Sequence, residues 1–140
     1  MVRIGITSGV FDIFHYWHWL YLKRCKDLCD FLIVGVDCDE LVKERKGKDR
    51  PFLDQSKREE IIQSLDFVDM TFIMESFDHF EEVLAVVKPA YLFKNEEYFT
   101  LNRKGEEHVG EIKLVPDVAP AVHTSDMIKV LKRKGFQIWT

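Results

Sequence analysis

The sequence predicts an α/β fold, with a doubly wound, five-stranded parallel sheet in a single domain that spans residues 1–140. The first observation is that short apolar runs alternate with longer segments of helical spacing. The second is that the connections are too long for hairpin turns, which favours parallel strands joined by right-handed crossovers. The third is that the chain contains no internal repeat, low-complexity tract or linker-like stretch, which indicates one folding unit.

The chain begins with a strand, a crossover helix and a second strand. Arg3–Ser8 and Phe31–Val36 are short apolar runs typical of buried parallel strands. Between them, Trp17–Cys29 contains neither glycine nor proline and places its apolar side chains on one helical face. These three segments therefore predict a strand–helix–strand unit.

The middle of the chain starts with a strongly charged segment. Lys43–Arg50 is expected to form an exposed basic loop that stops at Pro51, after which Asp54 or Ser56 caps a helix. The alternation then continues to the end of the chain. The remaining predicted elements are the strand Met70–Met74, the helix Phe80–Val87, the strands Tyr91–Phe93 and Ile112–Val115, and the helix Ser125–Lys134.

Composition excludes several classes of function. The chain has 20 Lys and Arg against 24 Asp and Glu, a net charge of −4 and a pI near 5.7, which is the wrong sign for a protein that follows a nucleic-acid backbone. Its uncharged stretches are shorter than the roughly 18–20 residues of a membrane span. The 3 cysteines form no Cys-x-x-Cys pair, and no signal peptide is visible, so we expect a cytoplasmic protein whose cysteines only pack.

The end of the first strand is the strongest candidate for chemistry. Small residues from Ser8 lead into a helix start, where His15 and His18 share one face. Backbone amides, a helix N-terminus and protonatable imidazoles suit a polyphosphate, which indicates phosphoryl or nucleotidyl transfer. The alternative is that Asp12 caps the helix and the two histidines are ordinary polar residues. A metal site built from the protein alone ranks last, because this spacing supplies only two ligands.

Two motifs at this turn resemble those of a known family. Gly9-Val10-Phe11-Asp12 and His15-Tyr16-Trp17-His18 are similar to the Gly-x-Phe-Asp turn and His-x-Gly-His helix start of the cytidylyltransferase-like nucleotidyltransferases. The resemblance covers most of residues 4–134 and is closest to glycerol-3-phosphate cytidylyltransferases and to heptose 1-phosphate adenylyltransferase domains. It implies a Rossmann-like fold. Further family-like positions are Gly35–Glu40, Lys46–Lys48, Arg50-Pro51, Lys57-Arg58 and Val68-Asp69.

The resemblance implies a reaction and a set of site residues. A phosphate oxygen of a small phosphorylated alcohol or sugar attacks the α-phosphorus of CTP, or of ATP, and pyrophosphate leaves, with Mg²⁺ on the triphosphate. The resemblance also implies a homodimer. The residues it assigns are His15, His18 and Lys46 for catalysis; Ser8, Gly9, Val10, Phe11, Asp12, His15, His18, Thr124 and Ser125 for the nucleotide; and Lys46, Lys48 and Arg58 for the second substrate.

The chain departs from the family pattern at three places. Trp17 replaces the glycine between the two histidines, where an indole either blocks the crevice or swings aside and stacks. Val118–Ser125 lacks the arginine that precedes the last helix in relatives, and Lys94–Tyr98 replaces a small glycine-containing turn. A catalytically silent relative that binds a nucleotide, metabolite or protein partner is therefore the alternative function. A redox dinucleotide binder is disfavoured because no Gly-x-Gly-x-x-Gly follows the first strand.

Read without the resemblance, the basic residues have a simpler interpretation. Charged runs such as Lys43–Arg50 are usually solvated surfaces, so Lys46 and Lys48 alone indicate no site. Arg58 on its own reads as a helix-surface residue.

Overall fold

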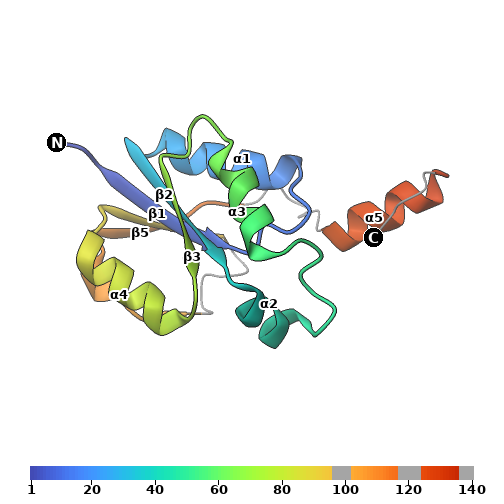
Figure 1. The fold of residues 1–140 in the computed structure, drawn as a ribbon. Helices are drawn as coiled ribbons and strands as arrows, with labels where there is room; N and C mark the ends of the chain where they lie inside the picture. Colours follow the sequence, from blue (N-terminus) through green and yellow to red (C-terminus); the bar gives the residue numbers. More distant parts are fainter. Residues whose placement is uncertain (96–101, 117–123, 136–140) are drawn as a thin grey trace.

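The computed structural model describes residues 1–95, 102–116 and 124–135, and its centre is a parallel sheet with helices on both faces (Figure 1). The sheet has 5 strands in the order β3-β2-β1-β4-β5, and every neighbouring pair is parallel. This confirms the predicted α/β class and strand number. The strands are β1 (Ile4–Gly9), β2 (Phe31–Asp37), β3 (Met70–Met74), β4 (Tyr91–Lys94) and β5 (Glu111–Leu114).

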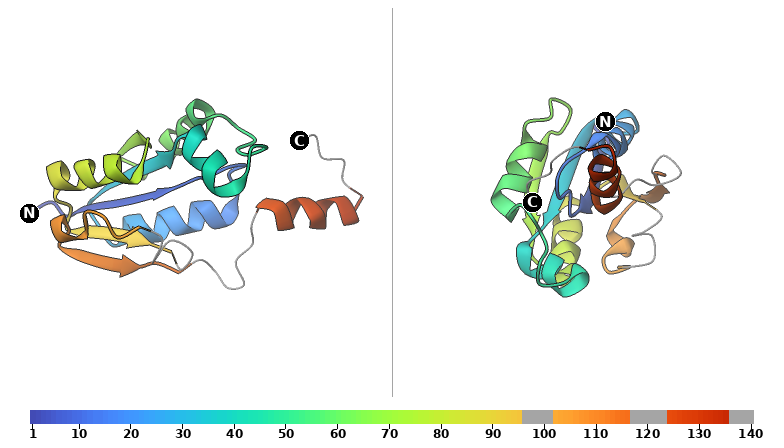
Figure 2. Two further views of the ribbon diagram at one scale, coloured as in Figure 1. Left: turned by 90° about the horizontal axis from the view of Figure 1, so that it is seen from below. Right: turned by 90° about the vertical axis from the view of Figure 1, so that its right-hand side faces the viewer.

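Helices α1, α3 and α4 form layers on the two sides of this sheet, while α5 projects away from it, as Figure 2 shows from two further directions. In Figure 1, α1 and α3 cover one face, α4 covers the other, and α2 lies near the carboxyl ends of the strands. No helix among the described residues is long and apolar enough to cross a membrane. The helices are α1 (Tyr16–Asp27), α2 (Asp39–Lys46), α3 (Gln55–Gln63), α4 (Phe77–Val87), α5 (Thr124–Arg133) and the short 3₁₀ helix η1 (Glu106–His108).

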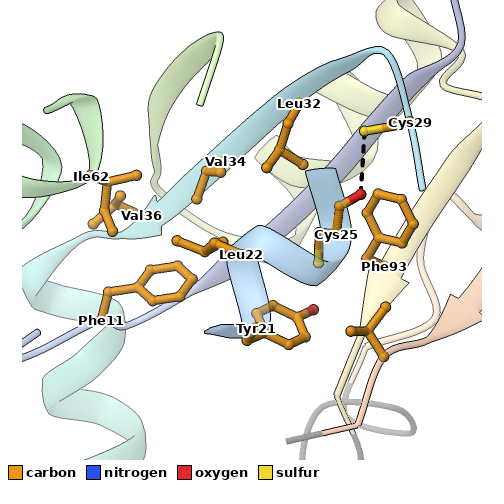
Figure 3. Close-up of a cluster of buried hydrophobic side chains, with 11 residues drawn as sticks. Phe11, Tyr21, Leu22, Cys25, Cys29, Leu32, Val34, Val36, Ile62 and Phe93 are labelled. Atoms are coloured by element: carbon orange, nitrogen blue, oxygen red, sulfur yellow. Dashed lines mark hydrogen bonds between the residues drawn. The ribbon is translucent and has the colours of Figure 1, made fainter. Parts of the chain in front are cut away.

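Strand β2 divides its side chains between two buried cores because successive residues of a strand point to opposite faces. Leu32 and Val34 join the core beneath α1 and α3, which Figure 3 shows, while Ile33 joins the core beneath α4. Cys25 and Cys29 lie in the first core, where the Sγ of Cys29 donates to the carbonyl oxygen of Cys25 at 3.4 Å. All 3 cysteines are buried free thiols, which confirms that they pack as small apolar side chains.

One predicted element is wrong. The segment expected to be a loop over residues 43–50 begins inside α2, and only residues 47–50 follow the helix. The helix forms because Leu41 and Val42 are buried beneath it, and because acidic residues occupy its first turn and basic residues its last turn, which suits the helix dipole. It ends at Gly47, whose φ of 105° is strained for other residues.

The order of the strands fixes where a ligand fits. From β1 the chain adds β2 and β3 on one side of the sheet, and it then adds β4 and β5 on the other side. The point where this direction changes, called the switch point, lies between β1 and β4. In sheets of this kind ligands bind at the switch point, beyond the carboxyl ends of the strands. A ligand is therefore expected beside the turn after β1 and the residues that end β2 and β4.

Candidate active site

The turn between β1 and α1 is held in an unusual backbone conformation. Phe11 has φ 52° and Ile13 has φ 45°, values that are uncommon for residues with a side chain and exceptional for a β-branched one. Gly9 precedes them, and a Cβ atom added there would lie 2.9 Å from the Phe11 ring. Backbone strain of this kind concentrates at binding and catalytic sites, where the surrounding structure maintains it.

Asp12 ties this turn to the segment that precedes α3. Its buried carboxylate accepts hydrogen bonds from the backbone N–H of Phe52 at 2.8 Å and of Leu53 at 3.1 Å. The Nε of Arg50 lies 3.6 Å from the same carboxylate. Asp12 does not cap α1, because the residue at the N-cap is His15. The alternative assignment of Asp12 as the helix cap is therefore wrong, and the carboxylate instead fixes the position of the turn.

His15 and His18 form a stacked pair at the start of α1. Their ring centroids are 3.8 Å apart, and both side chains are half-buried. The Nδ1 of His15 accepts from the backbone N–H of Trp17 at 3.2 Å, and the Nδ1 of His18 accepts from the backbone N–H of His15 at 3.3 Å. Since each Nδ1 is an acceptor, the neutral imidazoles carry their proton on Nε2. The pair thus holds two ring N–H donors beside a helix N-terminus, where an anion is stabilised.

Trp17 sits next to the histidine pair in the sequence but packs with another aromatic ring. Its half-buried indole lies edge-on to Tyr16, with ring centroids 4.7 Å apart. The ring contacts of His18 are with His15, Phe11 and Phe14. The indole and the imidazole stack therefore belong to different aromatic groups.

Arg58 lies inside the protein, although the resemblance assigned it to a substrate. Its side chain is fully buried, and its three donor nitrogens bind the carbonyl oxygens of Leu53 at 2.8 Å and Val10 at 2.9 Å and the carboxylate of Asp39 at 2.8 Å. With its donors used by the protein, the guanidinium holds the Val10 carbonyl of the turn. This burial and bonding favour a positioning role for Arg58, and its assignment to substrate binding stays a prediction.

The other residues assigned from the resemblance lie on separate segments. Lys46 is the last residue of α2, Lys48 follows it, and both are exposed. Thr124 and Ser125 are the first two residues of α5, whose backbone is described there without its side chains. The arginine-lacking stretch 118–123 and residues 96–98 lie outside the described residues.

A cavity opens at the carboxyl ends of the strands, next to the turn after β1. It encloses about 440 Å³ counted to its open mouth, and it continues the turn because Ser8 lies in its wall. Its lining combines apolar side chains with polar and charged ones. The lining residues are Ser8, Asp37, Arg45, Met74, Phe77, Phe80, Leu92, Phe93, Lys94, Asn95 and Asn102.

Asp37 is the most unusual group in this cavity. Its side chain is 1% exposed; Oδ2 accepts from Arg45 Nη1 at 2.7 Å, while Oδ1 accepts no hydrogen bond from any residue that the structure describes. Burial raises the pKa of Asp37 to about 6, and the nearby charges of Arg45, Arg58 and Lys46 oppose this shift. A buried polar atom without a partner costs roughly 1–3 kcal/mol.

Lys94, at the end of β4, lines the same cavity as Asp37. Its buried Nζ donates to the carbonyl oxygen of Asn102 at 2.6 Å and lies 3.1 Å from Glu106 Oε1. Sequence reasoning assigned no role in the site to Lys94, Arg45 or Asn102. The signal that was present is positional, because Asp37 and Lys94 each end a buried strand.

The described part of the chain does not gather three His, Cys, Asp or Glu side chains where they could hold a metal ion. A divalent cation at the turn would therefore take its ligands mainly from phosphate oxygens and water, as Mg²⁺ does in phosphate-binding sites. The residues present fit a metal ion that arrives with a nucleotide.

Comparison with known proteins identifies the family. The model of the cytidylyltransferase-like family matches residues 6–136. Two relatives are each named bifunctional protein HldE: one from a Nitratiruptor species is 41% identical over 91% of this chain, and one from Campylobacter fetus is 36% identical over 90%. The chain spans 25% and 27% of their lengths.

A solved structure shares both fold and sequence with this chain. The lipopolysaccharide core biosynthesis protein from Thermoplasma volcanium GSS1 is 27% identical with a TM-score of 0.64, over 84% of this chain and 97% of that one. The two chains therefore share the fold on which the site is built. The family match, which extends over nearly the whole chain, shows that the protein belongs to the cytidylyltransferase-like nucleotidyltransferases.

Proposed function

We propose that this protein transfers a nucleoside monophosphate from a nucleoside triphosphate to a small phosphorylated sugar, with release of pyrophosphate. The observation that carries the proposal is the stacked pair of His15 and His18, which holds two Nε2–H donors, that of His15 buried, at the N-terminus of α1 beside a strained turn. Donors held in this way stabilise negative charge that develops on phosphate oxygens.

The turn and the two histidines supply most of the expected catalysis. The reaction needs an attacking phosphate oxygen held in line with the bond to the leaving pyrophosphate, and it needs no covalent intermediate on the protein. The His15 and His18 rings donate to the triphosphate, and the backbone amides from Ser8 to Asp12 line its path. Mg²⁺ bound to the triphosphate neutralises part of its charge. Lys46 and Lys48, on the exposed segment after α2, contact phosphate oxygens of the nucleotide or acceptor.

The acceptor we favour is a sugar 1-phosphate of the heptose kind. The sequence resembles heptose 1-phosphate adenylyltransferase domains, and the similar structure from Thermoplasma volcanium is a lipopolysaccharide core biosynthesis protein. For that acceptor the nucleotide is ATP. The resemblance to glycerol-3-phosphate cytidylyltransferases had placed CTP ahead of ATP. CTP with glycerol 3-phosphate is the second pair to be tested.

The test is pyrophosphate release by the purified chain with Mg²⁺, each nucleotide and each acceptor, with the nucleoside-diphospho product identified by mass spectrometry. His18→Ala is expected to lower kcat/KM by roughly 100- to 1,000-fold, the loss that follows removal of one well-aimed donor. His108→Ala is the matched control, since His108 is a half-buried histidine on η1 that pairs with Glu107. Equal activity of the His18 variant and the wild type would contradict the assigned role.

A second candidate function is binding without turnover, favoured by the replacement of glycine by Trp17 and by the missing arginine in residues 118–123. A thermal-shift screen with ATP, CTP, GTP and UTP separates the two functions, because a bound ligand raises the unfolding temperature whether or not it reacts. A specific shift that His15→Ala abolishes, with no pyrophosphate released, is the result expected of a silent relative. The homodimer stays a prediction, to be checked by light scattering.

A further inference from the structure

We propose that the cavity beyond β2 and β4 binds the hydroxyl-bearing part of the acceptor, and that Asp37 determines acceptor specificity by accepting a hydrogen bond from one of its hydroxyl groups. The inference rests on the proposed function for the identity of the acceptor. It goes beyond that function by naming the chemical class that the cavity recognises and the residue that recognises it.

The place of the cavity is the first argument. Its wall includes the ends of three neighbouring strands, with Ser8 from β1, Asp37 from β2 and Lys94 from β4. Ser8 lies one residue before the end of β1, where the turn that leads to the histidine pair begins. A molecule in this cavity therefore lies beside the turn that receives the phosphates.

The charges of the cavity favour a neutral ligand group over a phosphate. Arg45 is 2.7 Å from the carboxylate of Asp37, and Lys94 is 3.1 Å from the carboxylate of Glu106, so each of these cations already faces an anion. An incoming phosphate would have to compete with both carboxylates. Hydroxyl groups avoid this competition, because they donate to carboxylates and accept from cations at the same time.

The polarity of the wall matches a sugar. The lining includes apolar side chains such as Phe77, Phe80 and Leu92, against which the C–H face of a sugar ring can pack. It also includes the polar residues Ser8 and Asn102. A ring with one apolar face and hydroxyl groups at its edge satisfies both kinds of side chain.

Asp37 Oδ1 is the atom that we expect to accept a hydrogen bond from the ligand. It is an acceptor without a partner among the described residues, on a side chain that is 1% exposed and lines the cavity. Arg45 fixes the other oxygen, which holds the carboxylate in one orientation. A hydroxyl group that donates to Oδ1 completes the hydrogen bonding of the carboxylate and is selected over a ligand without a hydroxyl there.

The test is calorimetric binding of heptose 1-phosphate, mannose 1-phosphate, glycerol 3-phosphate and inorganic phosphate to the wild type and to Asp37→Asn. In the variant, Arg45 continues to bind the side-chain oxygen, so an amide N–H₂ takes the place of Oδ1 and the acceptor becomes a donor. We expect the affinity of the best sugar phosphate to fall roughly tenfold or more, the effect of one hydrogen bond to a charged group, while that of inorganic phosphate is unchanged.

Two controls separate recognition from a general effect on the fold. Asp30→Asn alters an exposed aspartate just before β2, at the opposite end of that strand, and should leave sugar phosphate binding unchanged. The second control uses forms of the best sugar phosphate that each lack one hydroxyl group. One of them should bind the wild type about tenfold more weakly than the complete sugar phosphate does. That same form and the complete sugar phosphate should bind Asp37→Asn with equal affinity.

The inference is overturned if no sugar phosphate binds the wild type more tightly than inorganic phosphate does. It is also overturned if Asp37→Asn binds the sugar phosphate and inorganic phosphate with equally reduced affinity, or with wild-type affinity. Because binding is measured without a nucleotide, these outcomes are independent of whether pyrophosphate is released. Failure of the inference is therefore distinguishable from failure of the proposed reaction.

Discussion

Replacing Asp37 by asparagine should change how the stability of the protein depends on pH. In the folded protein the pKa of Asp37 is about 6, mainly because the carboxyl is buried, compared with an ordinary value of 3.8. The folded state therefore holds this proton more tightly than the unfolded state does. Asp37 contributes stability that is fully present below pH 3.8 and lost as the pH rises through 6.

The magnitude follows from the difference between these two pKa values. A shift of about two units corresponds to roughly 3 kcal/mol of unfolding free energy, of which roughly 2 kcal/mol is lost between pH 4 and pH 7. The charges that oppose this shift are those of Arg45, Arg58 and Lys46, and Lys94 lines the same cavity. Asparagine does not ionise, so the variant should gain stability relative to the wild type as the pH rises.

Urea unfolding of both proteins at half-unit steps from pH 4 to pH 7.5 measures this difference directly. Contributions from groups that titrate alike in both proteins cancel in the comparison, and equal m-values check that the same surface is exposed on unfolding. The reasoning is refuted if the two stability curves run parallel within about 0.5 kcal/mol, less than a third of the change expected from the pKa.

Three further substitutions test the packing that positions the site, each by urea unfolding. Arg58→Ala removes a fully buried guanidinium and leaves the Asp39 carboxylate and two carbonyl oxygens without their donor. We expect the free energy of unfolding to fall by roughly 3–5 kcal/mol. A fall below about 1 kcal/mol would show that the turn does not depend on this side chain. Gly9→Ala places a Cβ atom 2.9 Å from the Phe11 ring and should cost roughly 1–3 kcal/mol, and wild-type stability would mean that the ring moves freely. Tyr21→Phe removes the 2.9 Å hydrogen bond to Thr7 Oγ1 and should lower the free energy of unfolding by about 1 kcal/mol. An unchanged free energy of unfolding would show that this bond makes no net contribution to stability.

The inner strands β1 and β2 could be predicted from the sequence because they are largely buried. Met70–Met74 is observed as predicted, and Phe31–Val36 lengthens by one residue to include Asp37. Buried parallel strands appear in a sequence as continuous apolar runs, which polar residues then end. The same signal placed the first candidate site at the turn after β1.

The features that were missed depend on tertiary contacts. Helix α2 has only 8 residues and is mostly charged, so its two buried side chains, Leu41 and Val42, gave too weak a periodic signal. Arg58 was expected on a helix surface, because burial of a guanidinium becomes favourable only when three acceptors from distant segments surround it. The unpartnered oxygen of Asp37 likewise depends on where Arg45 lies, which no local pattern encodes.

The central claim is that the paired imidazoles at the start of α1 bind the phosphates that react. It is tested most directly by pyrophosphate release from ATP with heptose 1-phosphate and Mg²⁺, compared between wild type, His15→Ala and His18→Ala. The account predicts turnover by the wild type and a loss of roughly 100- to 1,000-fold in kcat/KM in each variant, with folding retained. Turnover that survives both substitutions would contradict it.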